Sequence, residues 1–130
     1  MNPAIISREH IQNIIERESA AFLAHHPKSH ELAQQTQQNF LFGVPLHWMA
    51  DWSTPVPLFV ERAHGAEFTC VDGHTYIDFC LGDTGAMFGH SAPDIAQTLR
   101  DYADQGYTAM LPTANSAKAG AALAERFGLP

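Results

Sequence analysis

The stretch EFTCVDGHTYIDF, residues 67–79, alternates apolar and polar residues on both sides of an Asp-Gly pair. This pattern is typical of a β-hairpin with Asp72 and Gly73 as a two-residue loop. In that register Phe68 lies opposite Ile77, and side chains alternate between the two faces of the hairpin. One face is then apolar, with Phe68, Cys70, Thr75, Ile77 and Phe79, and the other is mostly polar. This sorting of side chains into an apolar and a mostly polar face supports the register.

The same register separates the two cysteines of the chain. It places Cys80 opposite Gly65, about 16 Å along the strand from Cys70. This distance is beyond the reach of a disulfide. We expect both cysteines to be reduced and packed, and we expect no metal site between them.

Helices are predicted before the hairpin. The first follows Ser7 and ends at about His26, because Pro27 cannot continue it. The second is capped by Ser29 and runs through Phe40. Residues 44–57 hold three prolines and both tryptophans, and we expect an irregular segment that is covered or buried. Residues 58–62 then predict a strand.

Two further helices are predicted after the hairpin. Ser91 is expected to cap the first, which ends at Gly106 and turns an apolar face inward: Ile95, Leu99 and Tyr102. Residues 114–127 predict the last helix, with Gly128 and Pro130 as stop signals. The predicted fold class is therefore α+β, with N-terminal helices, a small antiparallel hairpin sheet and two further helices.

Composition and charge exclude several classes of protein. The chain has 130 residues, of which 45% are hydrophobic and 16% charged, as in a globular protein. Its net charge of −7 and its scattered basic residues argue against nucleic acid as a partner. No apolar run approaches the roughly 20 residues of a membrane span, and the first residues lack a signal-peptide pattern. We expect a cytoplasmic protein without a membrane partner.

The glycine-rich stretch LGDTGAMFGHSAP, residues 81–93, suggests three kinds of chemistry. A nucleophile elbow around Ser91 is disfavoured because Pro93 stands where the turn needs a small residue. A phosphate cradle is disfavoured because the glycine spacing matches neither nucleotide-binding motif. The third hypothesis is that the glycines let the backbone approach a ligand or another subunit, with Asp83 and Thr84 projecting into a site.

The histidines near the first helix end suggest no metal site. His26 and His30 have the spacing of zinc ligands on a helix, but Pro27 breaks that helix. We expect His25, His26 and His30 to form a solvated cluster.

Three linked motifs resemble those of class III aminotransferases. They are PLFVERAxGA at residues 57–66, VDGxxYIDF at residues 71–79 and GHxxP at residues 89–93. The resemblance covers residues 57–130 and is greatest to the glutamate-1-semialdehyde aminomutase-like and β-amino-acid aminotransferase branches. It implies the amino-terminal portion of a pyridoxal-phosphate enzyme of fold type I. Such enzymes work as homodimers and transfer an amino group between a small-molecule amino acid and a carbonyl acceptor.

The resemblance also implies domains and site residues. Residues 1–55 would be a helical arm and crossing segment, residues 56–106 part of the small domain, and residues 107–130 the lead-in to the large cofactor-binding domain. The stretch 81–88 would border the substrate, with Asp83, Thr84 and Gly85 lining the pocket. In residues 42–49, where β-amino-acid aminotransferases can place an arginine, His47 is the only candidate cation.

The residues that aminotransfer needs are mostly missing from the sequence. The reaction requires a lysine that bonds to pyridoxal phosphate. Lys28 and Lys118 both look solvated, and neither lies in a motif of the family. We therefore expect no catalytic residue in this chain, which would be an inactive leading fragment. Apolar residues that later parts would cover are then expected to be exposed: Phe68, Ile77, Phe79, Leu123 and Phe127.

Two other functions remain open. One is a small serine hydrolase that uses Ser91 with His90 or His74. The other is a non-catalytic binding or dimerisation module whose working surface is the helical arm, residues 7–40.

Overall fold

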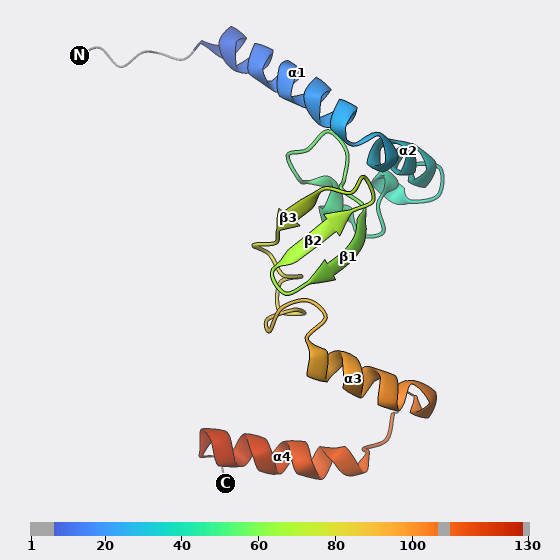
Figure 1. The fold of residues 1–130 in the computed structure, drawn as a ribbon, viewed down its shortest axis with the longest axis vertical. Coiled ribbons are helices and arrows are strands. Elements are labelled where there is room, and N and C mark those ends of the chain that lie inside the picture. Colours follow the sequence, from blue (N-terminus) through green and yellow to red (C-terminus); the bar gives the residue numbers. More distant parts are fainter. Residues whose placement is uncertain (1–6, 107–109, 129–130) are drawn as a thin grey trace, which may run out of the picture. The chain divides into compact units, whose positions relative to one another are not determined.

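A three-stranded antiparallel sheet lies at the centre of the first structural unit (Figure 1). Its strands are β1 (Val60–His64), β2 (Glu67–Cys70) and β3 (Thr75–Ile77), in the order β1-β2-β3. The computed structural model describes residues 7–106 and 110–128 of the chain. The chain divides after Ser91 into two compact units. Helices and one small sheet make an α+β fold, as predicted.

The register of the β2–β3 hairpin differs from the prediction by one residue. Phe68 pairs with Tyr76 rather than with Ile77, and their rings stack with centroids 5.3 Å apart. A slip of one residue moves every side chain of a strand to the opposite face. Ile77 consequently lies on the face away from Phe68 and is 55% exposed.

The hairpin turn has three residues, 71–73, instead of two. The backbone N–H of Cys70 donates to the carbonyl of His74 across its base, and Gly73 donates to the carbonyl of Cys70. Gly73 has φ +90°, the conformation expected of the last residue in a three-residue hairpin loop. The Asp-Gly pair therefore does mark the turn, but it does not form the whole of it.

The Asp72 side chain connects this turn to helix α2 (Pro27–Thr36). Its carboxylate accepts hydrogen bonds from the backbone N–H groups of Lys28 (2.7 Å) and Ser29 (3.1 Å), and from the Ser29 hydroxyl. The first amide groups of a helix have no partner inside it, and the helix dipole favours a negative charge there. Asp72 thus satisfies the amino terminus of a helix distant in sequence.

Helix α1 (Arg8–His25) begins as predicted, whereas α2 does not. Ser7 caps α1 by accepting a hydrogen bond from the backbone N–H of His10. The prediction that Ser29 caps α2 is wrong, because α2 begins at Pro27. Proline suits the first helical position, where its missing N–H has no partner to lose. Ser29 is fully buried and bonds to Asp72 instead.

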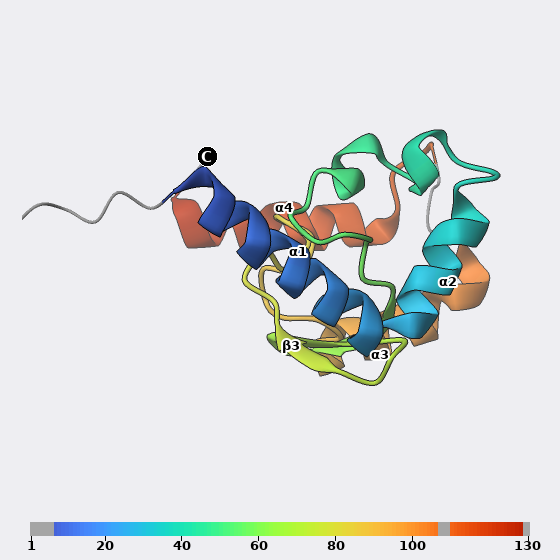
Figure 2. The same ribbon diagram turned by 90° about the horizontal axis from the view of Figure 1, so that it is seen from above.

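His26 holds the junction between α1, α2 and the hairpin. Its Nδ1 lies 2.8 Å from the carbonyl oxygen of Phe22, and its Nε2 lies 2.6 Å from the Tyr76 hydroxyl. Since a carbonyl only accepts, Nδ1 carries the proton and Nε2 accepts from Tyr76. His26 is 5% exposed, so the expectation of a solvated cluster is wrong for this residue. Figure 2 shows the change of direction between α1 and α2 at this point.

The Tyr76 hydroxyl at this junction has a raised pKa. The main cause is burial, which raises the pKa of Tyr76 above its ordinary value, and the negative charges of ionised Cys70 and Asp72 would raise it further. Tyr76 is therefore a neutral hydrogen-bond donor in the physiological range. A second histidine adds to the junction, since His74 Nε2 lies 2.8 Å from the carbonyl oxygen of His25.

The segment between α2 and β1 is irregular, as predicted, but it is not covered. It contains the short 3-10 turns η1 (Leu41–Gly43) and η2 (His47–Ala50). Trp48 is 46% and Trp52 56% exposed, so the expectation that this segment is buried is wrong. α2 also ends earlier, and β1 begins later, than the sequence pattern predicted.

The second unit contains α3 (Pro93–Tyr102), the 3-10 turn η3 (Ala103–Gln105) and α4 (Ala114–Phe127). The prediction that Ser91 caps α3 is wrong, because the N-cap residue is Ala92 and no side chain caps the helix. The predicted inward residues are also exposed by 41–51%: Ile95, Leu99 and Tyr102. The bounds of α4 and the left-handed Gly128 agree with the prediction. Pro130, the second predicted stop signal, lies outside the described residues.

Few apolar side chains are buried in the described part of the chain. Its fully covered hydrophobic residues are Ala33, Val44 and Cys70. Both cysteines are free, as predicted, but Cys80 is exposed rather than packed. Of the apolar residues expected to be exposed, Phe68 is half-buried, and the other four are 55–95% exposed: Ile77, Phe79, Leu123 and Phe127.

Two negative findings concern the described residues only. None of the helices there has the length and apolar content needed to cross a membrane. No group of three or more potential ligand side chains comes together there in a way that could hold a metal ion.

The contact of Asp72 with α2 predicts a loss of stability in Asp72→Ala. This variant leaves the first turn of α2 without its acceptor, and we expect the free energy of unfolding to fall by about 1–2 kcal/mol. Urea unfolding followed by circular dichroism measures this change in the free energy of unfolding. Asp51→Ala, at an exposed position, is the matched control and should change stability by less than about 0.5 kcal/mol.

The same contact predicts a loss of stability in acid. Desolvation raises the pKa of Asp72, but the hydrogen bonds from Ser29 and Lys28 outweigh it and hold the pKa below 3.8. A depressed pKa in the folded state stabilises the fold above the unfolded value and loses this effect as the pH falls through the folded value. Urea midpoints measured from about pH 5 to pH 2 should therefore fall less steeply in Asp72→Asn than in the parent chain. Parallel curves would contradict this assignment.

Gly89 allows a close backbone contact that a side chain would prevent. It has φ +89°, and a Cβ at this position would lie 3.2 Å from both Cα and the carbonyl oxygen of Gly65. We expect Gly89→Ala to destabilise the first unit by about 1–3 kcal/mol. Gly120 lies inside α4 with open space around it, so Gly120→Ala should stabilise that helix by roughly 0.5–1 kcal/mol. Thermal unfolding of both variants checks this, because the melting temperature should fall in Gly89→Ala and rise in Gly120→Ala.

Candidate functional site

The loop between β3 and α3 contains three of the four predicted site residues. Asp78 begins it, and one of its carboxylate oxygens, Oδ1, accepts hydrogen bonds from the backbone N–H groups of Cys80 and Leu81, both 2.9 Å long. The other oxygen, Oδ2, lies 2.7 Å from His90 Nε2. The bond from His90 is the largest cause that lowers the pKa of Asp78, followed by the bond from Leu81. Asp78 is therefore a carboxylate across the physiological range.

The far end of this loop lies against the turn between β1 and β2. The backbone N–H and carbonyl of His90 both bond to Gly65, at 2.8 and 2.9 Å. The Ser91 hydroxyl donates to the carbonyl of Ala63 at 2.9 Å. The close backbone approach that the glycines suggested is thus made by Gly89 to Gly65 of the same chain.

The backbone of the loop is tightly wound. Its internal hydrogen bonds use the N–H groups of Asp83, Gly85, Ala86 and Gly89. Leu81, Gly82 and Asp83 follow one another with φ of +50°, +60° and +61°. Left-handed backbone at the two non-glycine positions costs about 1–3 kcal/mol each and persists only where surrounding contacts impose it.

The predicted site residues of this loop face solvent. Asp83, Thr84 and Gly85 are all exposed. They are followed by two exposed apolar side chains, Met87 at 68% and Phe88 at 85%. The loop therefore presents a carboxylate, a hydroxyl and apolar groups on a fixed backbone, an arrangement able to contact a ligand or another polypeptide.

His47, the fourth predicted site residue, lies elsewhere in the first unit. It is exposed and begins the 3-10 turn η2, in the segment that leads into β1 at the end of the sheet where Val60 pairs with Cys70. The loop of residues 78–90 is joined to the opposite end, at Gly65 (Figure 1). The described chain thus does not bring His47 together with Asp83, Thr84 and Gly85.

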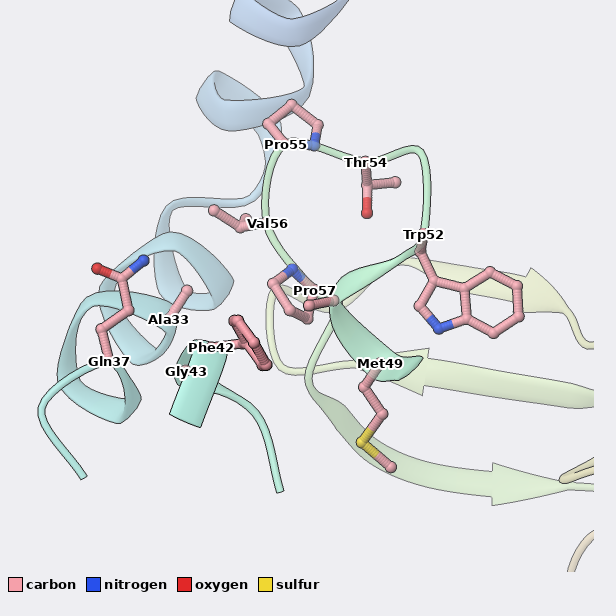
Figure 3. Close-up of a pocket in the computed structure, with 11 residues that line it drawn as sticks. Ala33, Gln37, Phe42, Gly43, Met49, Trp52, Thr54, Pro55, Val56 and Pro57 are labelled. Carbon is pink, nitrogen blue, oxygen red and sulfur yellow. The ribbon is translucent and has the colours of Figure 1, made fainter. Parts of the chain in front are cut away.

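A small open pocket lies beside the turn that contains His47 (Figure 3). Ala33 of α2 and Gln37, the residue after this helix, stand on one side, and Met49, Trp52 and Thr54 stand on the other. Its volume is about 140 Å³, below the roughly 300–1,000 Å³ of ordinary ligand sites. His47 is not among its lining residues, so this pocket does not bring a cation to a ligand.

Sequence reasoning missed the pairing of Asp78 with His90. One half of it has a local signal, because an aspartate often accepts hydrogen bonds from the backbone two and three residues later. The other half spans twelve residues and has none. In the sequence, His90 stands out as part of the GHxxP motif and as a candidate partner for Ser91, whereas nothing local marks it as the partner of a carboxylate.

Comparisons with known proteins agree with the motifs. No protein-family model matches the chain. A glutamate-1-semialdehyde 2,1-aminomutase of Thermoplasma acidophilum is 35% identical over 80 residues, which are 60% of this chain and 18% of that protein. The chain thus spans about a fifth of the length of the curated relatives that it matches.

Solved structures extend the match to most of the chain. The crystal structure of a glutamate-1-semialdehyde aminomutase from Pseudomonas aeruginosa superposes with a TM-score of 0.84 and 45% identity, over 92% of this chain and 26% of that one. A β-phenylalanine aminotransferase from Variovorax paradoxus superposes with a TM-score of 0.76 over 89% of this chain and 26% of that one. At 22% identity it shows the shared fold alone.

The sequence motifs and these matches identify the same family. The relatives named above are aminomutases or aminotransferases, and the Pseudomonas protein has also been solved in complex with PMP. The sequence and structure comparisons therefore both relate this chain to the pyridoxal-phosphate-dependent aminotransferase family that includes the glutamate-1-semialdehyde aminomutases.

Proposed function

We propose that this chain is the amino-terminal segment of an enzyme that transfers an amino group between an amino acid and a carbonyl acceptor. The observation that carries the proposal is the superposition on the Pseudomonas aminomutase, with 45% identity over 92% of this chain. Both aminotransferases and aminomutases are among the relatives, so the proposal covers either reaction. The proposed substrate is a small-molecule amino acid, the site of action is the cytoplasm, and the whole protein is a homodimer.

The glycine-rich loop is the proposed contribution of this chain to the substrate pocket. Asp83, Thr84 and Gly85 are exposed on a backbone whose conformation is held by hydrogen bonds. A preformed backbone can place a carboxylate and a hydroxyl at a ligand with little loss of entropy on binding. We further propose that His47 acts as a cation toward the substrate from a second segment of the assembled protein.

We propose that the described residues do not hold pyridoxal phosphate by themselves. The cofactor is held through a lysine. The two lysines of the sequence, Lys28 and Lys118, are exposed and do not line the pocket beside α2. Four amides of the glycine-rich loop donate to carbonyls of the loop itself: Asp83, Gly85, Ala86 and Gly89. We propose that the lysine and the phosphate-binding groups come from outside these 130 residues, and that the chain alone is inactive.

The exposed apolar residues support this proposal. Monomeric proteins rarely leave large contiguous apolar surfaces open, whereas here Phe79 is 95% and Phe127 67% exposed. The isoleucines on α1 are exposed as well: Ile11, Ile14 and Ile15. Further polypeptide, either from the same protein or from its partner subunit, would cover these residues.

The proposed domain arrangement follows from the same family resemblance. Residues 1–55 form the helical arm and crossing segment, residues 56–106 belong to the small domain, and residues 107–130 lead into the large domain. The division between the two structural units falls after Ser91, within the second of these segments. Neither structural unit alone corresponds to a complete domain of the proposed enzyme.

No observation favours the serine hydrolase. The Ser91 hydroxyl donates to the carbonyl of Ala63 rather than to a histidine. His90 Nε2 is bonded to Asp78, and His74 Nε2 to the carbonyl of His25. A hydrolytic serine needs a histidine that accepts its proton.

A chimera tests the proposed function. The matching quarter of the Pseudomonas aminomutase is replaced by this chain, and amino-transfer activity and cofactor binding are measured. We expect the chimera to bind the cofactor and to stay within about tenfold of the parent kcat/KM, because the two segments share one fold. Asp83→Ala and Thr84→Ala should then raise KM by about tenfold each, the effect of one lost polar contact. Asp104→Ala, at an exposed position, is the control.

Two outcomes would contradict the proposal. The first is a chimera that folds and binds the cofactor but transfers no amino group. The second is a saturable absorbance change on adding pyridoxal phosphate to the isolated chain that Lys28→Arg or Lys118→Arg abolishes, since that would show a cofactor lysine within it.

A further inference from the structure

The loop of residues 79–89 has a conformation that its own side chains do not explain. It contains three successive left-handed residues, Leu81, Gly82 and Asp83. Phe79, Met87 and Phe88 are 95%, 68% and 85% exposed, so the packing of these apolar side chains does not hold the loop. Its conformation must come from polar contacts.

The internal hydrogen bonds of the loop do not fix its position relative to the sheet. They join residues only three to five apart, such as Gly85 to Gly82 and Ala86 to Leu81. They define local turns, and those turns could move together as one unit. The loop is positioned only where its two ends are joined to the sheet and to one another.

The Asp78 side chain joins those two ends. Oδ1 binds the first two amides of the loop, those of Cys80 and Leu81, and Oδ2 binds the His90 ring at its far end. His90 is itself fixed to Gly65 by two backbone hydrogen bonds. Both side chains are largely covered, with 17% and 22% exposed for Asp78 and His90, so water competes little for this contact.

We propose that Asp78 and His90 form a clasp that fixes the glycine-rich loop, and that both are positioning residues for the substrate contacts of Asp83 and Thr84. The clasp itself follows from the contacts above, whereas its role toward a substrate rests on the proposed function. Neither side chain is assigned a contact with the reacting atoms. Their effect is transmitted through the backbone of the loop.

Amide hydrogen exchange of the isolated chain tests the clasp. His90→Ala and Asp78→Ala should each speed exchange of the amides of residues 80–89 by about tenfold or more, because the loop then opens locally. Exchange at Thr69 and Cys70 in β2 should stay unchanged. His90→Gln restores a donor for Asp78 and should recover most of the protection. His10→Ala, at an exposed position of α1, is the matched control.

Two results would overturn the clasp. One is unchanged loop exchange in both alanine variants. The other is an equal rise in the loop and in β2, which would mean that the pair supports the whole unit. If the alanine variants do not fold, Asp78→Asn and His90→Gln are compared. Asn keeps the acceptor for Cys80 and Leu81 but loses the charge toward His90, so loop exchange should rise more in Asp78→Asn than in His90→Gln. The reverse order would contradict the clasp.

The active chimera tests the positioning role. His90→Ala should lower kcat/KM by about tenfold or more while cofactor affinity stays constant, and His90→Gln should restore most of it. Unchanged kcat/KM in His90→Ala would overturn the positioning role, even if loop exchange rises. An inactive parent chimera would instead reject the proposed function, and the exchange experiment would still decide whether the clasp exists.

Discussion

The carboxylate of Asp72 at the amino terminus of α2 is the contact on which the first unit depends. It satisfies two backbone amides and the buried hydroxyl of Ser29. Beside it, His26 bonds to Tyr76 and so joins the end of α1 to β3. Since α1 has no buried residue, these polar contacts rather than an apolar core attach the helices to the sheet. Buried polar groups are stable only when they are fully paired, and no buried side-chain polar atom lacks a partner in the described residues.

This contact also explains where sequence reasoning succeeded and where it failed. The bounds of α1 and α4, the hairpin and the α+β class follow from local patterns of capping, periodicity and turn residues, which act within a few positions. The strand register does not follow from them, because the hairpin turn contains three residues, 71–73, where the Asp-Gly pair predicts two. The contact of the Asp72 side chain with a helix some forty residues away also has no local signal. Ser29 and Ser91 were read as helix caps for the same reason. Serine is a residue type common at helix N-caps, but the hydroxyl of each of these serines bonds to a turn or strand that is distant in sequence.

The candidate site shows the same limit. The glycine-rich loop and its exposed Asp83 and Thr84 could be selected from the sequence, because consecutive glycines and a family motif stand out locally. That Gly89 contacts Gly65, and that His90 pairs with Asp78, depends on how the hairpin ends meet. The separation of His47 from this loop likewise depends on the strand order. A motif thus indicates which residues matter, whereas only the fold shows which of them act together.

The distribution of buried residues links the fold to the proposed function. A segment that were stable and complete in itself would bury its large apolar side chains, since their removal from water is the main favourable term in folding. Here the described hydrophobic residues that are buried are small ones, Ala33, Val44 and Cys70, and the large ones are exposed or half-buried. The polar junction around Asp72 and the clasp at Asp78 therefore hold two ends of a sheet whose outer surfaces are unfinished. That division fits the proposed function, in which contacts within this chain shape the loop and further polypeptide covers its apolar surface.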